Sequence, residues 1–150
     1  MAVRALLLVL LTALLSACAS MSRDASFAAP EITAADAATL ATDSAQHLAT
    51  ALPPARTTLL LQPAKTDVMT AALLRQLIDQ GFGVIEADPR AKGAQSAPAD
   101  AVSLRYLASP LDAGVVVRLQ YRGIEASRYY PRAADGSLVT AAPFTVREAQ

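Results

Sequence analysis

The fold of this chain is decided by one stretch, Val115-Val116-Val117-Arg118-Leu119-Gln120-Tyr121. Its odd-numbered positions are all apolar, and two of the three positions between them are polar. A period of two residues predicts a β-strand with one buried face and one solvent-facing side. Sheets with one solvated face are typically antiparallel, so we expect antiparallel neighbours joined by tight turns.

The segments on either side continue this pattern. Upstream, residues 102–106 alternate in the same way, and residues 109–114 form a turn. Downstream, Gly123 allows a tight turn into a strand at residues 124–130. We therefore expect an antiparallel meander with one apolar face.

The C-terminal part adds one more strand to this meander. Asp135-Gly136 is a strong hairpin signal. The last strand is predicted at residues 138–146, with Pro143 marking an edge or a bulge.

A strand, a helix and a second strand precede the meander. Residues 57–62 contain three consecutive leucines between prolines, which suits a strand buried on both faces. Thr66 or Asp67 caps the helix, and Gly81 with Phe82 ends it in a Schellman-type turn. Its apolar face is formed by Met69, Ala72, Leu73, Leu77 and Ile78. Residues 83–86 are the second strand, which completes a compact βαβ unit.

An alanine-rich helix is predicted at residues 33–52. Thr33 and Asp36 resemble a capping box, and Pro53-Pro54 ends the helix. Because alanine dominates its buried side, we expect this helix to be peripheral, with a face that docks on a partner. His47 is expected to be a solvated helix residue.

The N-terminal residues have the pattern of a secretory signal peptide: one positive charge, an apolar run from Ala5 to Leu15, and then small residues. The run is too short to span a bilayer as a helix. Leu15, Ser16, Ala17 and Cys18 resemble the lipobox of bacterial lipoproteins. The resemblance implies a diacylglycerol thioether on Cys18, and cleavage before Cys18 would leave it as the first residue, acylated with a fatty acid such as palmitate.

Two other interpretations of this region remain open. An ordinary signal peptidase could cut after Ala19 and release the protein, or Cys18 could be a small buried residue. The lipid interpretation is favoured because Cys18 is the only cysteine, so it has no disulfide partner within the chain.

The domain organisation follows from these segments. We predict a signal peptide at residues 1–17, a lipidated N-terminus with a flexible tether at 18–32, and a single α+β domain at 33–150. Acyl chains would hold the protein on a membrane without crossing it. Ala19 is not the aspartate that retains many Gram-negative lipoproteins in the inner membrane, which favours the periplasmic side of the outer membrane.

The sequence offers little for catalysis or nucleic-acid binding. The formal net charge is zero, and the chain has one histidine. Neither a glycine-rich phosphate loop nor a Cys/His zinc spacing is present in the sequence. We expect no enzymatic activity, cofactor, metal site or direct contact with nucleic acid.

Basic residues on the expected outward face have two interpretations. They could bind an acidic partner, or they could be solvated positions that discourage edge pairing. These residues are Arg105, Arg118, Arg122 and Arg128. Residues 88–100 are predicted to be a long exposed loop, in which Arg90 and Lys92 are solvated.

Several stretches, in this order, resemble the conjugal transfer protein TrbH family. They are Leu52-Pro53-Pro54-Ala55-Arg56-Thr57, Ala72-Leu73-Leu74-Arg75, Gly81-Phe82-Gly83-Val84, Ser127-Arg128-Tyr129-Tyr130, Asp135-Gly136-Ser137-Leu138 and Phe144-Thr145-Val146-Arg147-Glu148. The family usually has a glycine and an aromatic residue where this chain has Ala142-Pro143-Phe144. The resemblance implies a lipoprotein of mating-pair formation and type IV secretion.

Two functions are therefore expected from the sequence. The first is a structural or assembly factor, anchored in the cell envelope, whose partners are other subunits of the conjugation channel. The second is a small periplasmic binding lipoprotein for a lipid, peptide or glycan, unrelated to conjugation. Neighbouring conjugation genes would favour the first.

Overall fold

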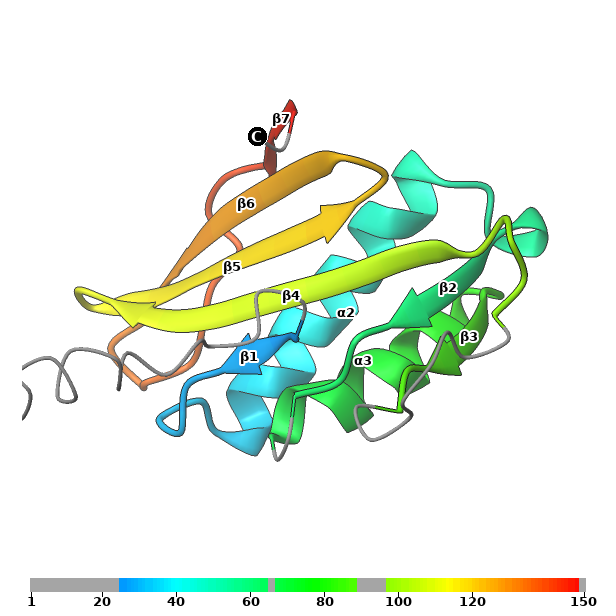
Figure 1. Cartoon of the computed structure of the whole chain (residues 1–150). Helices are drawn as coiled ribbons and strands as arrows, with labels where there is room; N and C mark the ends of the chain where they lie inside the picture. The colour runs from blue at the N-terminus through cyan, green and yellow to red at the C-terminus, as the bar shows by residue number, and fades with distance from the viewer. Residues whose placement is uncertain (1–24, 65–66, 89–96, 149–150) are drawn as a thin grey trace, which may run out of the picture.

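The computed structural model describes residues 25–64, 67–88 and 97–148. Within them, two helices cover one face of a mixed seven-stranded sheet (Figure 1), which confirms the predicted α+β class. The sheet order is β3-β2-β4-β5-β6-β7, and β1 also pairs with β4. The elements are β1 (Phe27–Ala28), α2 (Ala34–Ala51), a short 3-10 helix η1 (Pro54–Arg56), β2 (Thr58–Leu61), α3 (Val68–Asp79), β3 (Gly83–Glu86), β4 (Val102–Leu111), β5 (Gly114–Tyr121), β6 (Ile124–Pro131) and β7 (Thr145–Glu148).

Strands β4 to β7 form the predicted antiparallel meander. Arg122 and Gly123 both have positive φ, 48° and 70°, as a two-residue type I′ hairpin requires. The turn predicted at residues 109–114 is shorter than expected, because β4 continues to Leu111 and only Asp112 and Ala113 connect it to β5.

The last strand differs from the prediction of residues 138–146. Leu138 makes only an isolated bridge to Arg132, and the sheet is rejoined at Thr145 as the short strand β7. Pro143 has no backbone N–H to donate to a ladder. The following residue, Phe144, packs on α2 by stacking on His47.

The βαβ unit has the predicted order and caps. Strands β2 and β3 are parallel neighbours, and Asp67 caps α3 by accepting from the Thr70 N–H at 2.7 Å. At the other end the N–H groups of Gly81 and Phe82 donate to Ile78 and Leu77, the two bonds of a Schellman motif.

Two details of this unit were predicted wrongly. Strand β2 is not buried on both faces: Leu59 and Leu61 are fully buried, whereas Leu60 is partly exposed. Both helices lie on one side of the sheet, so only alternate residues of β2 are covered (Figure 1). Ile78, predicted on the apolar face of α3, is 55% exposed.

Helix α2 begins as predicted but is not peripheral. Thr33 and Asp36 form a reciprocal capping box with two 3.1 Å bonds. Leu40 and Leu48 are fully buried, as are the alanines between them, and α2 packs against α3. Small alanine side chains let a helix approach its neighbours closely, so a shallow apolar face can be buried completely.

The segment predicted to be a tether, residues 18–32, is partly integrated into the domain. Strand β1 pairs in parallel with β4, placing Phe27 beside Leu107. The Ser26 hydroxyl accepts a 3.1 Å bond from the Tyr106 N–H, and Ile32 is buried. Residues 18–24 lie outside the described residues, as do residues 89–96 of the predicted loop.

Burial of α2 makes a testable prediction. Leu40→Ala should lower the free energy of unfolding by about 2–5 kcal/mol, as should Leu77→Ala, because each removes a fully buried side chain. Ile78→Ala, at an exposed position, should change it by no more than about 0.5 kcal/mol. Urea denaturation of the purified variants measures all three. A Leu40→Ala effect as small as that of Ile78→Ala would show that α2 is peripheral after all.

Candidate functional site

The predicted lipid-attachment residues are outside the described part of the chain. This applies to Cys18 and to the recognition residues Leu15, Ser16 and Ala17. Neither α2 nor α3 is long and apolar enough to cross a membrane, and no other helix in the described residues is. The described part of the domain contains several networks of polar side chains.

An inward polar cluster joins α2 to β6. Arg128 donates from Nη1 to both carboxylate oxygens of Asp43, at 2.9 and 2.8 Å, and Tyr130 donates its hydroxyl to the same carboxylate. The side chains of Arg128 and Asp43 are only 14% and 17% exposed. Burial, reinforced by the bond to Asp43, raises the pKa of Tyr130 well above its ordinary value, so the hydroxyl stays a donor.

A similar tyrosine–aspartate hydrogen bond holds helix α3 against the sheet. The Tyr106 hydroxyl, from β4, donates to the Asp67 carboxylate at 2.6 Å and also contacts the Thr70 hydroxyl. Burial is the main cause of the raised pKa of Tyr106, followed by the bond to Asp67. Asp67 therefore caps α3 and holds the start of that helix against β4.

A third bond connects the start of α2 to the residue that follows β6. Arg132 donates to Asp36 at 2.9 and 3.2 Å, and Asp36 is almost completely buried. Burial opposes ionisation of Asp36, but the bonds from Arg132 and Thr33 outweigh it and lower the pKa of the carboxyl group. The capping box of α2 is therefore also an anchor to the sheet.

His47 extends the inward cluster toward the C-terminal segment. Its Nε2 lies 3.0 Å from the Tyr121 hydroxyl, and its ring stacks on Phe144 with centroids 4.2 Å apart. Burial is the largest effect on His47 and lowers its pKa, aided by Arg128 and opposed by Asp43. The expectation of a solvated histidine is wrong, since the imidazole is half-buried between β5 and the C-terminal segment.

The outer face of the sheet carries a separate polar network. Arg105 donates to Gln120, which donates to Glu125 at 3.1 Å, and Arg147 donates to the other oxygen of Glu125 from Nε at 3.1 Å. The bond from Gln120 is the largest influence that lowers the pKa of Glu125, with Arg147 and Arg118 adding to it. The network crosses four strands, β4 to β7.

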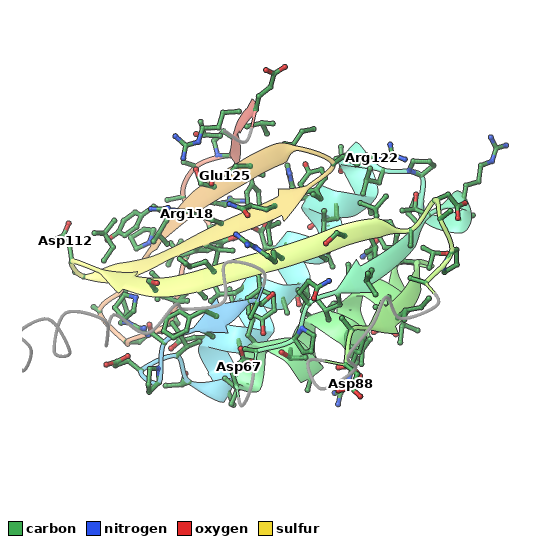
Figure 2. All side chains as sticks on the ribbon, viewed as in Figure 1. Asp67, Asp88, Asp112, Arg118, Arg122 and Glu125 are labelled. Carbon is green, nitrogen blue, oxygen red and sulfur yellow. The ribbon has the colours of Figure 1, made fainter. Side chains whose placement is uncertain are left out.

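The four predicted outward arginines do not share one face. Arg105 and Arg118 lie on the outer face, where Figure 2 labels Arg118, and Arg122 is in a hairpin turn. The prediction that Arg128 faces outward is wrong. Arg128 pairs with the inward Val117, and its side chain points to α2. Arg90 and Lys92 are outside the described residues.

The inward cluster was not predicted from the sequence, although two spacings in the sequence are consistent with it. Asp43 and His47 are one helical turn apart, and Arg128 and Tyr130 are two residues apart on one strand. Their partnership depends on how α2 crosses β6, which local spacing does not encode. Within the described ranges, no group of three or more His, Cys, Asp or Glu side chains is placed to hold a metal.

The comparisons with known proteins point to one family. The family model described as conjugal transfer protein TrbH matches residues 20–149. No curated protein and no solved structure matches the chain.

The lowered pKa of His47 predicts a pH dependence of stability. As the pH falls below the ordinary value of 6.5, the unfolded chain takes up a proton that the folded imidazole resists, so the free energy of unfolding should fall. Since this is the only histidine, His47→Gln should flatten the dependence just below pH 6.5. Urea denaturation at a series of pH values measures both. An equal slope in the two proteins would show that burial does not oppose protonation of His47.

Proposed function

The chain belongs to the TrbH family of conjugal transfer proteins, and from this premise we propose that it is a lipid-anchored structural component of a conjugative DNA-transfer apparatus. The observation that carries the proposal is the extent of the family match, residues 20–149, which includes the whole described domain. The match begins two residues after Cys18, so the lipobox-like residues lie directly before it.

The lipid would act by confining the domain to a membrane surface. Each buried methylene contributes about 0.8 kcal/mol, so one acyl chain binds marginally and two or more bind stably. Diacylglycerol on Cys18 plus an N-terminal acyl chain satisfies this condition. We place the anchored domain on the periplasmic side of the outer membrane, since aspartate does not follow Cys18. Confinement raises its effective concentration near other envelope components.

The arrangement of polar groups supports a structural rather than a catalytic role. Asp43, Asp67 and Asp36 each accept bonds that hold a helix against the sheet or the residue after it. The carboxylate oxygens that accept these bonds are held in place by neighbouring donors, which is the use expected of structural groups. The helix-free face of the sheet is left as the surface for binding other molecules (Figure 1).

Mating assays test the proposal. Deleting the gene should reduce plasmid transfer without changing growth or plasmid copy number. A Cys18→Ser variant should complement poorly at normal abundance, because it would lose its lipid. Asp79→Asn, at an exposed position on α3, should complement fully and serves as the matched control.

Two results would contradict the proposal. Full transfer in the deletion strain would remove the role in conjugation. Full complementation by Cys18→Ser, with the protein still in the membrane fraction, would remove the role of the lipid.

A further inference from the structure

We propose that the helix-free face of the sheet lies against anionic lipid headgroups, with Arg105 and Arg118 as the contacting cations. This inference rests on the proposed function, in which Cys18 carries a lipid, and it adds which surface of the domain faces the membrane. Three observations carry it: the charge of this face, its exposed apolar end, and the point at which the chain enters the domain.

The outer face has an excess of positive charge. Alternation along the paired strands places three arginines and one acid outward in the described parts of β2 to β7: Arg105, Arg118, Arg147 and Glu125. Arg147 pairs with Glu125, so these two charges offset each other. Arg105 is held by the neutral Gln120, and Arg118 is exposed. Two positive charges therefore remain on neighbouring strands, available to an anionic surface.

An apolar end lies beside these arginines. Phe27, Leu111 and Tyr129 are 39%, 49% and 37% exposed, and the strand register puts all three on the outer face near the β4–β5 hairpin. Tyr129 lies over Gly114, where an added Cβ would be 2.6 Å from the tyrosine hydroxyl oxygen. Aromatic residues with a polar end are enriched where proteins meet the membrane–water interface.

Phe27 is aligned with Arg118 through Leu107, so an aromatic side chain lies close to a basic residue. Asp112 in the hairpin adds one acid at the far end. Apolar side chains near basic residues are the composition that a headgroup layer accommodates.

The chain enters the domain on this same face. Ala25, the first described residue, lines a small hollow together with Arg105, Arg118 and Gln120. Six residues lie between it and Cys18, and the seven residue steps from Cys18 to Ala25 span about 25 Å at most when fully extended. An acyl chain on Cys18 would therefore hold the membrane close to Arg105 and Arg118, whereas α2 and α3 lie behind the sheet (Figure 1).

This proximity is what makes the charge effective. Attraction between exposed charges is screened beyond about 10 Å at 0.1 M salt. Two arginines could not draw a free domain from solution against that screening. Once the lipid has brought the face to the surface, they can select its orientation.

The test uses the lipid-anchored protein reconstituted into vesicles. Cys18 is the only native cysteine and is blocked by its lipid, so Ser109→Cys gives a unique thiol on the outer face for an environment-sensitive fluorophore. Thr50→Cys, exposed on α2, is the matched control on the opposite side. Quenching by neutral acrylamide is compared on phosphatidylcholine vesicles and on vesicles that also contain phosphatidylglycerol.

We expect the Ser109 probe to be protected only on the anionic vesicles, and the Thr50 probe to be quenched equally on both. Arg118→Glu should abolish the protection, as should raising the salt to about 0.5 M, where screening is strong. Arg75→Glu, an exposed arginine of α3, should leave the protection intact.

The possible failures are distinguishable. If the protein does not float with phosphatidylcholine vesicles, the lipid anchor is wrong and this inference falls with it. If it floats but the Ser109 probe is quenched equally on both vesicles, the anchor stands and the docking face is wrong. Protection in native envelopes but not on anionic vesicles would show that this face binds a protein instead.

Discussion

The rest of the structure depends on one constraint: the sheet is covered on a single face. Both helices lie on that face, so every second residue of each long strand must be apolar or must find a polar partner there. Val117 and Leu119 satisfy the constraint by being apolar, and Tyr106 and Tyr130 do so by donating to aspartates of the helices. The opposite face is free to carry charge.

The inward Arg128 shows what the constraint demands of a charged side chain. Removing an ion from water costs several kcal/mol, on the order of what excellent geometry can return. Asp43 accepts two bonds from Nη1 of Arg128, whereas the buried Nε of Arg128 has no hydrogen-bond partner in the described residues. The rings of Tyr130 and Phe144 lie 5.4 and 5.5 Å from the guanidinium and contribute further contact. Because these groups come from α2, β6 and the C-terminal segment, the cluster defines how the three pack together.

The features predicted correctly were those encoded locally. The alternation at residues 115–121, the caps at Thr33 and Asp67, and the Schellman turn at Gly81 each depend on neighbours within a few residues. The errors concern contacts between distant segments. The burial of Leu40 depends on how closely the alanines let α2 approach its neighbours. The alanine-rich composition by itself indicated weak packing of this helix.

The candidate site shows the same difference between locally encoded features and long-range contacts. Arg105 and Arg118 were correctly placed outward by the period of their strands, whereas the direction of Arg128 depends on its pairing with Val117. The pairing of β1 with β4 was missed because residues 26–32 have no periodicity of their own. Their order comes from a strand more than seventy residues later.

The proposed function depends on two things, the family to which the chain belongs and a lipid anchor on one residue. Membership in the TrbH family assigns the chain to conjugal transfer, and the proposed lipid on Cys18 would position the domain and its basic face. Mass spectrometry of the N-terminal peptide from envelope-purified protein tests this most directly. We expect the peptide to begin at Cys18 and to carry a diacylglycerol thioether and an acylated amine. A peptide that begins at Ser20, or an unmodified Cys18, would contradict the proposed lipid anchor.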